Sequence, residues 1–505
     1  MSALPSSSII GVVGAGAMGA GIAQVAARAG HTVLLYDTRP DAAEKGRAGI
    51  LSDFAKLVAK GRLSAEDAEA AGGRVRPAAA LADFAQAGLV IEAIVEDLSV
   101  KRGLFRDLEA IVSADAILAT NTSSLSITAI AAGLTRPERV AGMHFFNPAP
   151  IMALVEVISG IATAPGVAAT LVDTARAWGK QPVRAKSTPG FIVNRVARPF
   201  YAEGLRLLEE GAGDVATLDA VMREAGGFRM GPFELMDLIG HDVNFAVTRS
   251  VFDAYFGDPR FRPSLTQQEL VAAGWLGRKT KRGFYDYGPD ATPPAPAALP
   301  VGPVPRALRI EGDLGPAEAL VKPFGEAGIA IERTDGTGLI RLDGATLALT
   351  DGRSATRRAA EDGIADLVLF DLALDYGAAT RIALAKADQA SPETLAKAAS
   401  LFQALGKTVS ALDDVPGLLV MRTLAMLANE AADTVLQGVA SPPDIDRAMT
   451  AGVNYPKGPL AWADHVGPAR ILAVLEALQA NYGDDRYRPS SLLRRRVAAG
   501  RALSS

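Results

Sequence analysis

A glycine-rich turn between two apolar segments near the start of the chain constrains the fold more than any other feature. Apolar β-branched residues dominate positions 9–13 and predict a buried strand, and the sequence GAGAMG follows at once at 14–19. An alanine-rich helical pattern and a second predicted strand at 32–36 come next, and Asp37 ends that strand. Strand, glycine turn, helix, strand and acid in this order predict a dinucleotide-binding Rossmann unit.

Each glycine of this turn, and the acid that follows the second strand, has a physical role in binding a dinucleotide. Gly14 permits the tight turn, Gly16 lets the backbone approach a pyrophosphate, and Gly19 lets the helix pack closely on the strand. The helix N-terminus offers unpaired N–H groups and the positive end of its dipole to the phosphates. Asp37 can accept hydrogen bonds from an adenosine ribose and would repel a 2′-phosphate, so the expected cofactor is NAD and not NADP.

Length and composition limit the remaining possibilities. A chain of 505 residues exceeds what one hydrophobic core supports, so about three or four domains are expected. A formal charge of −4 gives no electrostatic reason to expect nucleic acid or an anionic membrane as a partner. The chain has no cysteine, which excludes disulfides and cysteine-bound metal, and we expect no metal site. Without an export signal or an apolar run of membrane length, a cytoplasmic protein is expected.

Polar clusters follow predicted strands in the first part of the chain. Strands alternate with helices from residue 8 to about 186, which predicts a doubly wound, mostly parallel sheet. Ligands bind beyond the carboxyl ends of the strands in such sheets. The clusters around Glu96, Ser123 and His144 each come after a strand, so we expect them to share one site.

The pattern becomes helical after Pro189, and residues 191–210 predict one long amphipathic helix. A Pro/Ala-rich linker then marks a domain boundary, and a weaker α/β pattern without G-x-G-x-x-G spacing follows it. The expected fold is an α/β Rossmann domain, an all-α domain, a degenerate Rossmann-like α/β domain without a dinucleotide site, and a second all-α domain. These four domains are expected at 1–187, 188–290, 306–411 and 412–505, and the linker is expected at 291–305.

The second all-α domain repeats the first. The sequence PGFIVNR at 189–195 recurs 227 residues later as PGLLVMR, and Asp237 recurs as Asp464 at the same offset. Asn194 of the first copy is replaced by Met421 in the second. This substitution indicates a second copy kept for packing and not for catalysis.

These motifs resemble those of the L-3-hydroxyacyl-CoA dehydrogenase family, in its bacterial form with a duplicated C-terminal domain. The resemblance is close from residue 8 to about 287 and looser over the repeat at 405–503. Besides the glycine turn, it rests on the sequences EAIVE at 92–96, NTSS at 121–124, HFFNP at 144–148 and PGFIVNR at 189–195.

The resemblance implies the site residues. The family's catalytic pair is a His in the HFFNP motif and a Glu twelve residues on, which fall on His144 and Glu156. Ser123 and Asn194 match the family's substrate contacts, and Lys60 falls where the family has a Lys near the CoA phosphates. The expected cofactor-binding residues are Gly14, Gly16, Met18, Gly19, Asp37, Glu96, Lys101 and Asn121.

Elementary chemistry favours the same pair. Oxidising a secondary alcohol needs a base for the hydroxyl proton, and His144 alone among the four histidines follows a strand near the glycine turn. Glu156 interrupts an apolar strand, so its carboxylate needs a partner that the imidazole can supply. Either Ser123 or Ser124 can donate a hydrogen bond to the developing carbonyl oxygen, and the residues alone leave this choice open.

The expected reaction is the NAD-dependent oxidation of an L-3-hydroxyacyl-CoA to its 3-oxo form. The architecture resembles that of enzymes acting on 3-hydroxyadipyl-CoA in phenylacetate breakdown, with 3-hydroxybutyryl-CoA of short-chain fatty acid metabolism as the alternative substrate. A non-catalytic NAD-binding protein is the alternative from another class. Because family members dimerise through the helical domain, we expect the two copies to pack on each other within one chain, and a further homo-oligomer stays open.

Overall fold

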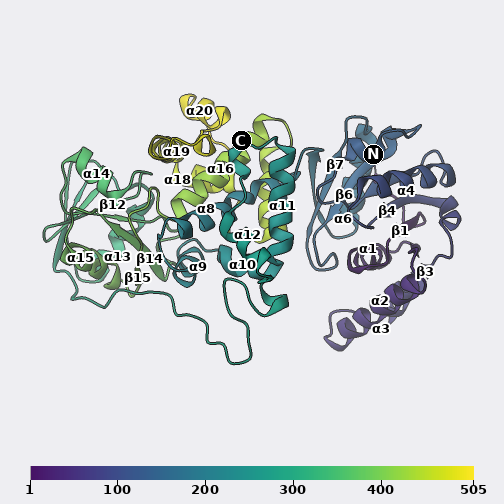
Figure 1. Ribbon diagram of the computed structural model, residues 1–505, viewed down its shortest axis with the longest axis horizontal. Coiled ribbons are helices and arrows are strands. Elements are labelled where there is room, and N and C mark those ends of the chain that lie inside the picture. The colour runs from purple at the N-terminus through teal and green to yellow at the C-terminus, as the bar shows by residue number, and fades with distance from the viewer. Residues whose placement is uncertain (1) are drawn as a thin grey trace. The chain divides into compact units, whose positions relative to one another are not determined.

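The computed structural model describes residues 2–505, which form two compact units (Figure 1). The first unit comprises residues 2–195 together with Gln437–Val453, and the second comprises Val196–Leu436 together with Asn454–Ser505. A short segment of the second helical copy therefore belongs to the same compact unit as the glycine turn.

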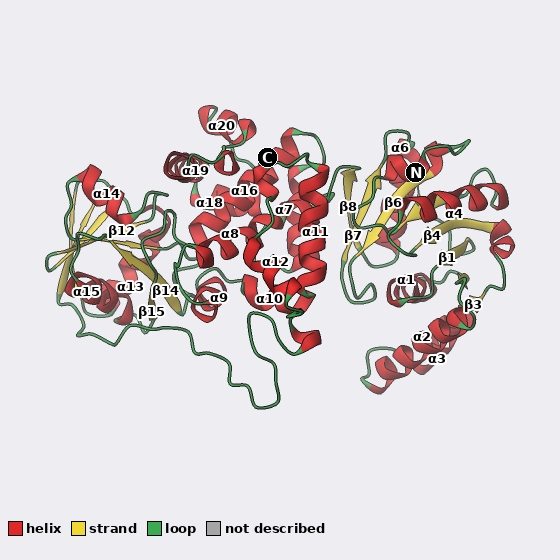
Figure 2. Ribbon diagram, viewed as in Figure 1, coloured by secondary structure: helices red, strands yellow, loops and turns green. Residues whose placement is uncertain are grey.

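Within residues 2–505, the first unit is built on an eight-stranded sheet with the order β3-β2-β1-β4-β5-β6-β7-β8 (Figure 2). All neighbours run parallel except β6 and β7, which are antiparallel. The chain order reverses between β1 and β4, which is where open α/β sheets bind ligands. The strands are β1 (Ile9–Val13), β2 (Val33–Tyr36), β3 (Val75–Pro77), β4 (Ala87–Glu92), β5 (Ile117–Thr120), β6 (Val140–Phe145), β7 (Leu154–Ser159) and β8 (Gln181–Lys186).

Helices connect these strands, and the central strands have apolar residues buried on both faces, as a covered parallel sheet requires. Helix α1 starts inside the glycine turn and buries its alanine-rich face against β1 and β2. The helices of this unit are α1 (Ala17–Arg28), α2 (Ala42–Ala59), α3 (Ala65–Arg74), η1 (Leu81–Gln86), α4 (Leu98–Ile111), α5 (Ile127–Ala131), η2 (Pro137–Arg139), α6 (Pro165–Ala177), α7 (Val193–Val196) and α17 (Pro442–Val453).

The expectation of a single helix over 191–210 is wrong. The chain forms the short helix α7 and then α8 (Arg198–Glu209), with Ala197 between them. Pro199 explains the break, because proline lacks an N–H donor and is tolerated only in the first turn of a helix, where α8 places it.

Helix α17 packs on β7 and β8 of the first unit. The backbone N–H of Lys186 donates to the carbonyl of Val439 at 2.9 Å. A Cβ atom at Gly452 would lie 2.4 Å from the end of the Leu154 side chain, so glycine permits the close approach of α17 to β7. A segment of the second helical copy thus covers the strand that carries Glu156.

The second unit contains a seven-stranded sheet, counted within residues 2–505, with the order β10-β9-β11-β12-β13-β14-β15. It is mixed, because β11 is antiparallel to β9 and β12, and β13 is antiparallel to β14. This confirms the expected degenerate Rossmann-like domain. Its strands are β9 (Ala307–Glu311), β10 (Ala330–Thr334), β11 (Leu339–Leu342), β12 (Ala345–Leu349), β13 (Leu367–Phe370), β14 (Arg381–Lys386) and β15 (Thr408–Ala411).

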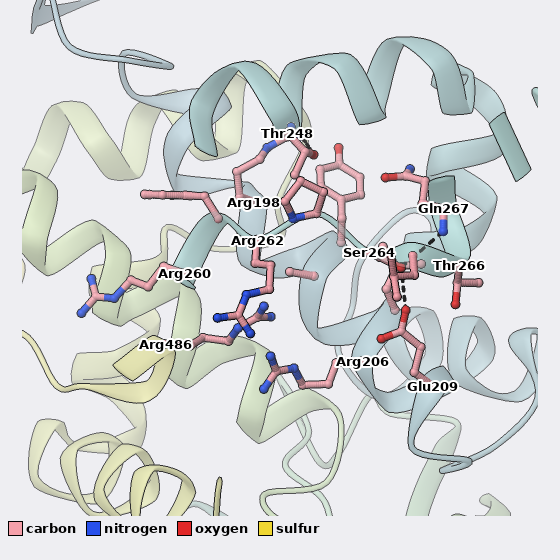
Figure 3. Close-up of a pocket in the computed structure, with 16 residues that line it drawn as sticks. Arg198, Arg206, Glu209, Thr248, Arg260, Arg262, Ser264, Thr266, Gln267 and Arg486 are labelled. Atoms are coloured by element: carbon pink, nitrogen blue, oxygen red, sulfur yellow. Dashed lines mark hydrogen bonds between the residues drawn. The ribbon is translucent and has the colours of Figure 1, made fainter. Parts of the chain in front are cut away.

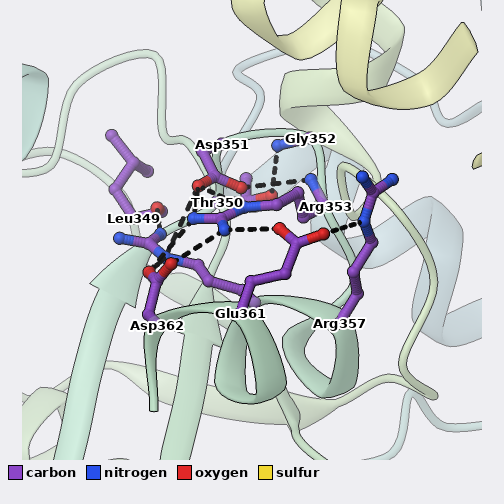
Figure 4. A network of polar contacts seen from close by, with 9 residues as sticks. Leu349, Thr350, Asp351, Gly352, Arg353, Arg357, Glu361 and Asp362 are labelled. Atoms are coloured by element: carbon purple, nitrogen blue, oxygen red, sulfur yellow. Dashed lines mark hydrogen bonds and ion pairs between the residues drawn. The ribbon is translucent and has the colours of Figure 1, made fainter. Parts of the chain in front are cut away.

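An ion-pair network occupies the carboxyl end of β12 (Figure 4). The Arg353 guanidinium donates to the carboxylates of Asp351, Glu361 and Asp362 at 2.7–2.9 Å. Near the end of β9, a Cβ atom at Gly315 would lie 2.4 Å from the Arg470 guanidinium. Charged side chains therefore line a cavity of about 720 Å³ at this end of the sheet.

In the second unit, α8, α18, α19 and α20 pack around α16, which is almost wholly buried, while α13, α14 and α15 pack on the sheet. Helix α8 of the first copy packs on α16 of the second, and the buried Arg422 donates to Glu203 across this contact at 2.8 Å. The helices are α8, α9 (Val215–Glu224), α10 (Pro232–Ile239), α11 (His241–Ala254), η3 (Pro259–Phe261), α12 (Leu265–Ala272), η4 (Arg278–Thr280), η5 (Gly315–Leu320), α13 (Val321–Glu326), α14 (Ala355–Asp362), α15 (Pro392–Gln403), α16 (Val420–Leu436), α18 (Pro459–Val466), α19 (Pro468–Tyr482), η6 (Asp485–Tyr487) and α20 (Ser491–Ala498).

The internal repeat extends to backbone detail. Phe191 and Leu418, which are repeat equivalents, both have positive φ angles, of 47° and 51°. Helix α9 packs on β14 in the second unit just as α17, its repeat equivalent, packs on β7 in the first. Each copy of the helical repeat thus contributes one helix to the sheet of the other half.

Candidate active site

The glycine turn has the geometry that a dinucleotide needs. Gly14 has φ +102°, and a Cβ atom there would lie 2.4 Å from the carbonyl oxygen of Ala93. At Gly19 a Cβ atom would lie 1.7 Å from the Gly14 carbonyl, so the first turn of α1 lies directly against the loop. Gly16 differs, because no heavy atom of residues 2–505 outside its immediate surroundings lies within 4 Å of a Cβ placed there. This open side, next to the N-terminus of α1, fits a pyrophosphate.

A cavity of about 1040 Å³ begins at this turn and extends along α1 and α2. Its lining is strongly basic, because it includes six Arg and Lys side chains but, among the described residues, only the acid Asp53. Phosphate groups suit such a lining. The cations are Arg28, Arg39, Lys45, Lys56, Lys60 and Arg62.

Asp37 lies at the end of β2, beside the turn. Its Oδ2 accepts a hydrogen bond from the Ala15 N–H at 2.8 Å, and the Arg39 guanidinium donates to both carboxylate oxygens at 2.9–3.0 Å. The hydrogen bond from Arg39, with that from Ala15, outweighs burial and holds the pKa of Asp37 well below its ordinary value. Asp37 is therefore an ionised acceptor beside the expected adenosine ribose.

A buried carboxylate that the sequence reasoning did not single out lies at the end of β4. Glu92 is fully buried and accepts hydrogen bonds from Lys101 and from the Thr120 hydroxyl, both at 2.6 Å. The same Lys101 ammonium lies 3.2 Å from Glu96. A glutamate closing the apolar run Leu89–Ile91 was the available signal, since a buried acid needs partners.

Glu96 orders the loop that contains the two candidate serines. Its Oε1 accepts from the Thr122 hydroxyl at 2.6 Å and from the N–H groups of Ser123 and Ser124 at 3.0 and 3.2 Å. Burial would raise the pKa of Glu96, but the Thr122 hydrogen bond and the Lys101 charge outweigh it and lower that pKa. The helix cap of α5 is Ser126, so neither Ser123 nor Ser124 serves that structural purpose.

His144 and Glu156 face each other across the antiparallel pair β6 and β7. The Nδ1 atom of His144 lies 2.7 Å from Oε2 of Glu156, and both residues are buried. His144 belongs to β6 itself, whereas the sequence placed it beyond the strand end. The Phe146 ring packs against the imidazole with centroids 4.5 Å apart. With Nδ1 donating to the carboxylate, Nε2 carries the lone pair that a base requires.

The second oxygen of Glu156 binds the start of α7. Its Oε1 accepts from the N–H groups of Ile192 and Val193, each at 3.0 Å. The next residue, Asn194, places its amide Nδ2 3.4 Å from the Ser123 carbonyl oxygen. The structure therefore brings His144, Glu156, Ser123 and Asn194 together, and one carboxylate links the imidazole to the helix that carries Asn194.

Three other expected residues take different places in the first unit. Asn121 accepts a hydrogen bond at Oδ1 from the Phe145 N–H at 2.8 Å, which ties the end of β5 to β6. Met18 is half-buried in the first turn of α1 and packs against the core. Lys60 is exposed at the end of α2 and lines the large cavity, whose lining does not include His144.

The second half lacks this constellation. Asp371 and Ala383 stand at the repeat positions of His144 and Glu156, and the Asp371 N–H donates to the Ala383 carbonyl. Asp371 accepts from the N–H groups of Leu419 and Val420 at 2.9 and 2.7 Å, the equivalents of Ile192 and Val193. The second half keeps the bond to the helix start without a histidine.

Comparison with known proteins gives a consistent picture. A family model described as "3-hydroxyacyl-CoA dehydrogenase, NAD binding domain" matches residues 9–188, and the model of the C-terminal domain matches 190–287 and 417–504. A model described as "3-hydroxybutyryl-CoA dehydrogenase reduced Rossmann-fold domain" matches 347–416.

Individual relatives cover either the whole chain or its first part. The chain is 47% identical to a 3-hydroxyadipyl-CoA dehydrogenase of Escherichia coli over 97% of both chains. It is 43% identical to the human mitochondrial hydroxyacyl-coenzyme A dehydrogenase, over 55% of this chain and 90% of the relative. A crystal structure of a 3-hydroxybutyryl-CoA dehydrogenase from E. coli matches with a TM-score of 0.90 at 45% identity, over 98% of this chain and 99% of the other.

Proposed function

Because this chain belongs to the 3-hydroxyacyl-CoA dehydrogenase family and is an NAD-dependent dehydrogenase of that family, we propose that it oxidises 3-hydroxyadipyl-CoA at C3. One observation carries the choice of acyl group: the relative with that name matches over 97% of both chains, the second half included. Breakdown of phenylacetate is the pathway that we propose. The alternative substrate is 3-hydroxybutyryl-CoA, because a solved structure with the same architecture is that of a 3-hydroxybutyryl-CoA dehydrogenase.

We propose His144 as the catalytic base. Its Nε2 takes the proton of the substrate hydroxyl, while Nδ1–H keeps its hydrogen bond to Glu156, 2.7 Å away. The carboxylate fixes this tautomer and stabilises the imidazolium that forms, as the acid does in a catalytic triad. Bound NAD supplies the acceptor for the hydride that leaves C3.

The substrate oxygen needs a donor opposite the imidazole. We propose Ser123 for this role, with Asn194 beside it. The Asn194 amide contacts the Ser123 carbonyl oxygen, and Asn194 directly follows Val193, whose N–H group donates to Glu156. Ser124 is the alternative, since both hydroxyls lie within hydrogen-bond distance of Glu96. A donor aimed at the oxygen where charge develops accelerates such reactions.

Other residues are proposed to bind the cofactor and the CoA group. The Gly16 backbone would hold the pyrophosphate, Asp37 the adenosine ribose, and Lys60 the phosphates of CoA. The remaining cofactor contacts that we propose are Gly14, Met18, Gly19, Glu96, Lys101 and Asn121. No helix among residues 2–505 is long and apolar enough to cross a membrane, and we propose a cytoplasmic location.

The two helical copies are proposed to pair within one chain, in place of the dimer contact of single-copy relatives. The buried ion pair between Arg422 and Glu203, one from each copy, supports this. We also propose the domain order expected from the sequence, with a boundary in the linker at 291–305.

A truncation tests the pairing. A chain ending at Ala291 loses α16, which covers α8, and is expected to dimerise or aggregate because an apolar face becomes exposed. Size-exclusion chromatography with light scattering measures this. A monodisperse monomer with the thermal stability of the full chain would contradict the pairing.

Two variants separate chemistry from cofactor binding. His144→Gln is expected to lower kcat at least ~10³-fold while NAD binds as in the wild type, because only the base is lost. Gly16→Ala is expected to keep the wild-type Tm and to weaken NAD binding at least ~10-fold, because the methyl group enters the open space at the turn. Steady-state kinetics and calorimetric titration with NAD measure both. Near-normal turnover of His144→Gln would remove it from the role of base.

A substrate panel tests the acyl group. NADH-coupled turnover is measured on 3-oxoacyl-CoAs of four and six carbons, with and without a terminal carboxylate. We expect kcat/KM for the six-carbon ω-carboxyl substrate to exceed that of its unsubstituted partner at least ~10-fold, because a recognised carboxylate adds charge-assisted hydrogen bonds. A preference for the four-carbon substrate would favour 3-hydroxybutyryl-CoA instead.

A further inference from the structure

A second cavity, of about 410 Å³, lies in the second unit against α8, α11 and the segment 259–267 (Figure 3). Among the residues that the structure describes, five arginines line it and Glu209 is the one acid, whose carboxylate accepts from the Ser264 hydroxyl. None of these residues belongs to the proposed active site. The arginines are Arg198, Arg206, Arg260, Arg262 and Arg486.

Three of these guanidinium groups contain a buried N–H donor without an acceptor. Within residues 2–505, the Nε atoms of Arg198, Arg260 and Arg486 are buried and have no hydrogen-bond partner. A buried donor without an acceptor is costly and uncommon in native proteins, so these arginines are not fully compensated by groups of the chain itself.

Arg198 has the most incomplete set of partners. It is 5% exposed, its Nη1 donates to the Thr248 hydroxyl at 3.1 Å, and its guanidinium carbon lies 4.8 Å from the centre of the Tyr201 ring. It forms no ion pair with a carboxylate in the part of the chain that the structure describes. Burial lowers the pKa of Arg198. A buried cation that contacts only a hydroxyl and a ring is stabilised by any anion that can reach it.

The internal repeat provides a reference for the other end of the cavity. In the first copy, the buried Arg260 donates through Nη1 to both Glu430 and Asp433 of the second copy. Its repeat equivalent is Arg486, in the segment GDDRYRPS that matches GDPRFRPS. In the first arrangement two acids therefore compensate one buried arginine.

The second arrangement is different, because the position equivalent to Asp433 is Arg206. Arg486 is left with Glu203, the equivalent of Glu430, at 3.8 Å, which is too long for a hydrogen bond. Replacing an acid by a base changes the local charge by two. The cavity lies beside Arg206 and Arg486, where this positive charge occurs.

The cationic groups face a shared region. Figure 3 shows Arg206, Arg262 and Arg486 extending toward one another, with Arg260 turned away. The carboxylate of Asp484 compensates part of this charge, at 3.7 Å from Arg206 and 3.8 Å from Arg262. Glu203 lies 3.8 Å from Arg486, and the Tyr487 hydroxyl accepts from Arg206 at 3.1 Å. These contacts leave N–H donors of the three guanidinium groups available.

We propose that this cavity binds the phosphoryl group of a small anion. A phosphoryl group has a charge of about −1.5 to −2 near pH 7 and three strong acceptor oxygens, which match a cavity lined by five arginines and one acid among the described residues. A carboxylate has half that charge and two oxygens. Guanidinium groups bind phosphoryl oxygens in pairs, and the volume leaves space for part of an organic group.

Calorimetric titration of the full chain with inorganic phosphate tests the proposal. NAD is present at saturation so that the cofactor cavity is occupied, and ionic strength is held constant with chloride. The test variants are Arg206→Asp, which installs the residue of the matching position, and Arg198→Met, which keeps an unbranched apolar stem and removes the guanidinium. The control is Arg494→Met, because Arg494 is exposed on α20 and pairs with Glu476. Melting curves verify that each variant is folded.

We expect one phosphate per chain with a Kd below about 1 mM, at least ~10-fold weaker binding in both test variants, and unchanged binding in the control. If one test variant does not fold, the other decides. Adenosine 3′,5′-bisphosphate distinguishes the sources through the part of its binding that both test variants lose: if that part is tighter than phosphate binding it identifies a nucleotide, and if it is equal or weaker it identifies free phosphate. No saturable uptake by the wild type, or wild-type affinity in a folded Arg206→Asp or Arg198→Met chain, would overturn the site.

Discussion

The contacts of the Glu156 carboxylate are the interaction on which the active site depends. Glu156 is fully buried, and an ionised carboxylate is stable there only if its oxygens are bound. One oxygen binds His144, and the other binds the N–H groups of Ile192 and Val193 at the start of α7. The same group therefore fixes the base on the sheet and positions Asn194 on the helix. Removing it would leave a buried imidazole and two buried donors unpaired.

The second half of the chain keeps part of this arrangement without the histidine and the glutamate. Asp371, at the position of His144, binds the two N–H groups at the start of α16, while Ala383 replaces the glutamate. Arg353 and its acids lie at the carboxyl end of β12. The bond that joins sheet to helix is thus present in both halves, whereas the histidine is not. In return α17 of this half covers β7, so the second half still supports the strand that carries Glu156.

Much of the fold and of the candidate site could be predicted from the sequence, and there are physical reasons why the other features could not. The glycine turn and the Glu in an apolar strand are local signals, and they identified the Rossmann unit and the pairing of His144 with Glu156. The domain that contains β12 and β14 showed only a weak α/β pattern, because alanine in ATLAL and RIALAK and the terminal charges of RIALAK weaken the strand signal. The break at Pro199 was overlooked within a strong helical period. The cavity of arginines depends on contacts between copies about 226 residues apart, which no local pattern can indicate.

The tautomer of His144 tests the role of Glu156 most directly. In Glu156→Gln the amide can still accept from the backbone N–H groups through its oxygen, while its NH₂ faces Nδ1 of His144 and requires that atom to accept. Two-bond ¹H–¹⁵N NMR spectra, with the His144 signals assigned by their loss in His144→Gln, distinguish the two tautomers. The account predicts a proton on Nδ1 in the wild-type protein and on Nε2 in the folded Glu156→Gln variant. An unchanged His144 tautomer in that variant would contradict it.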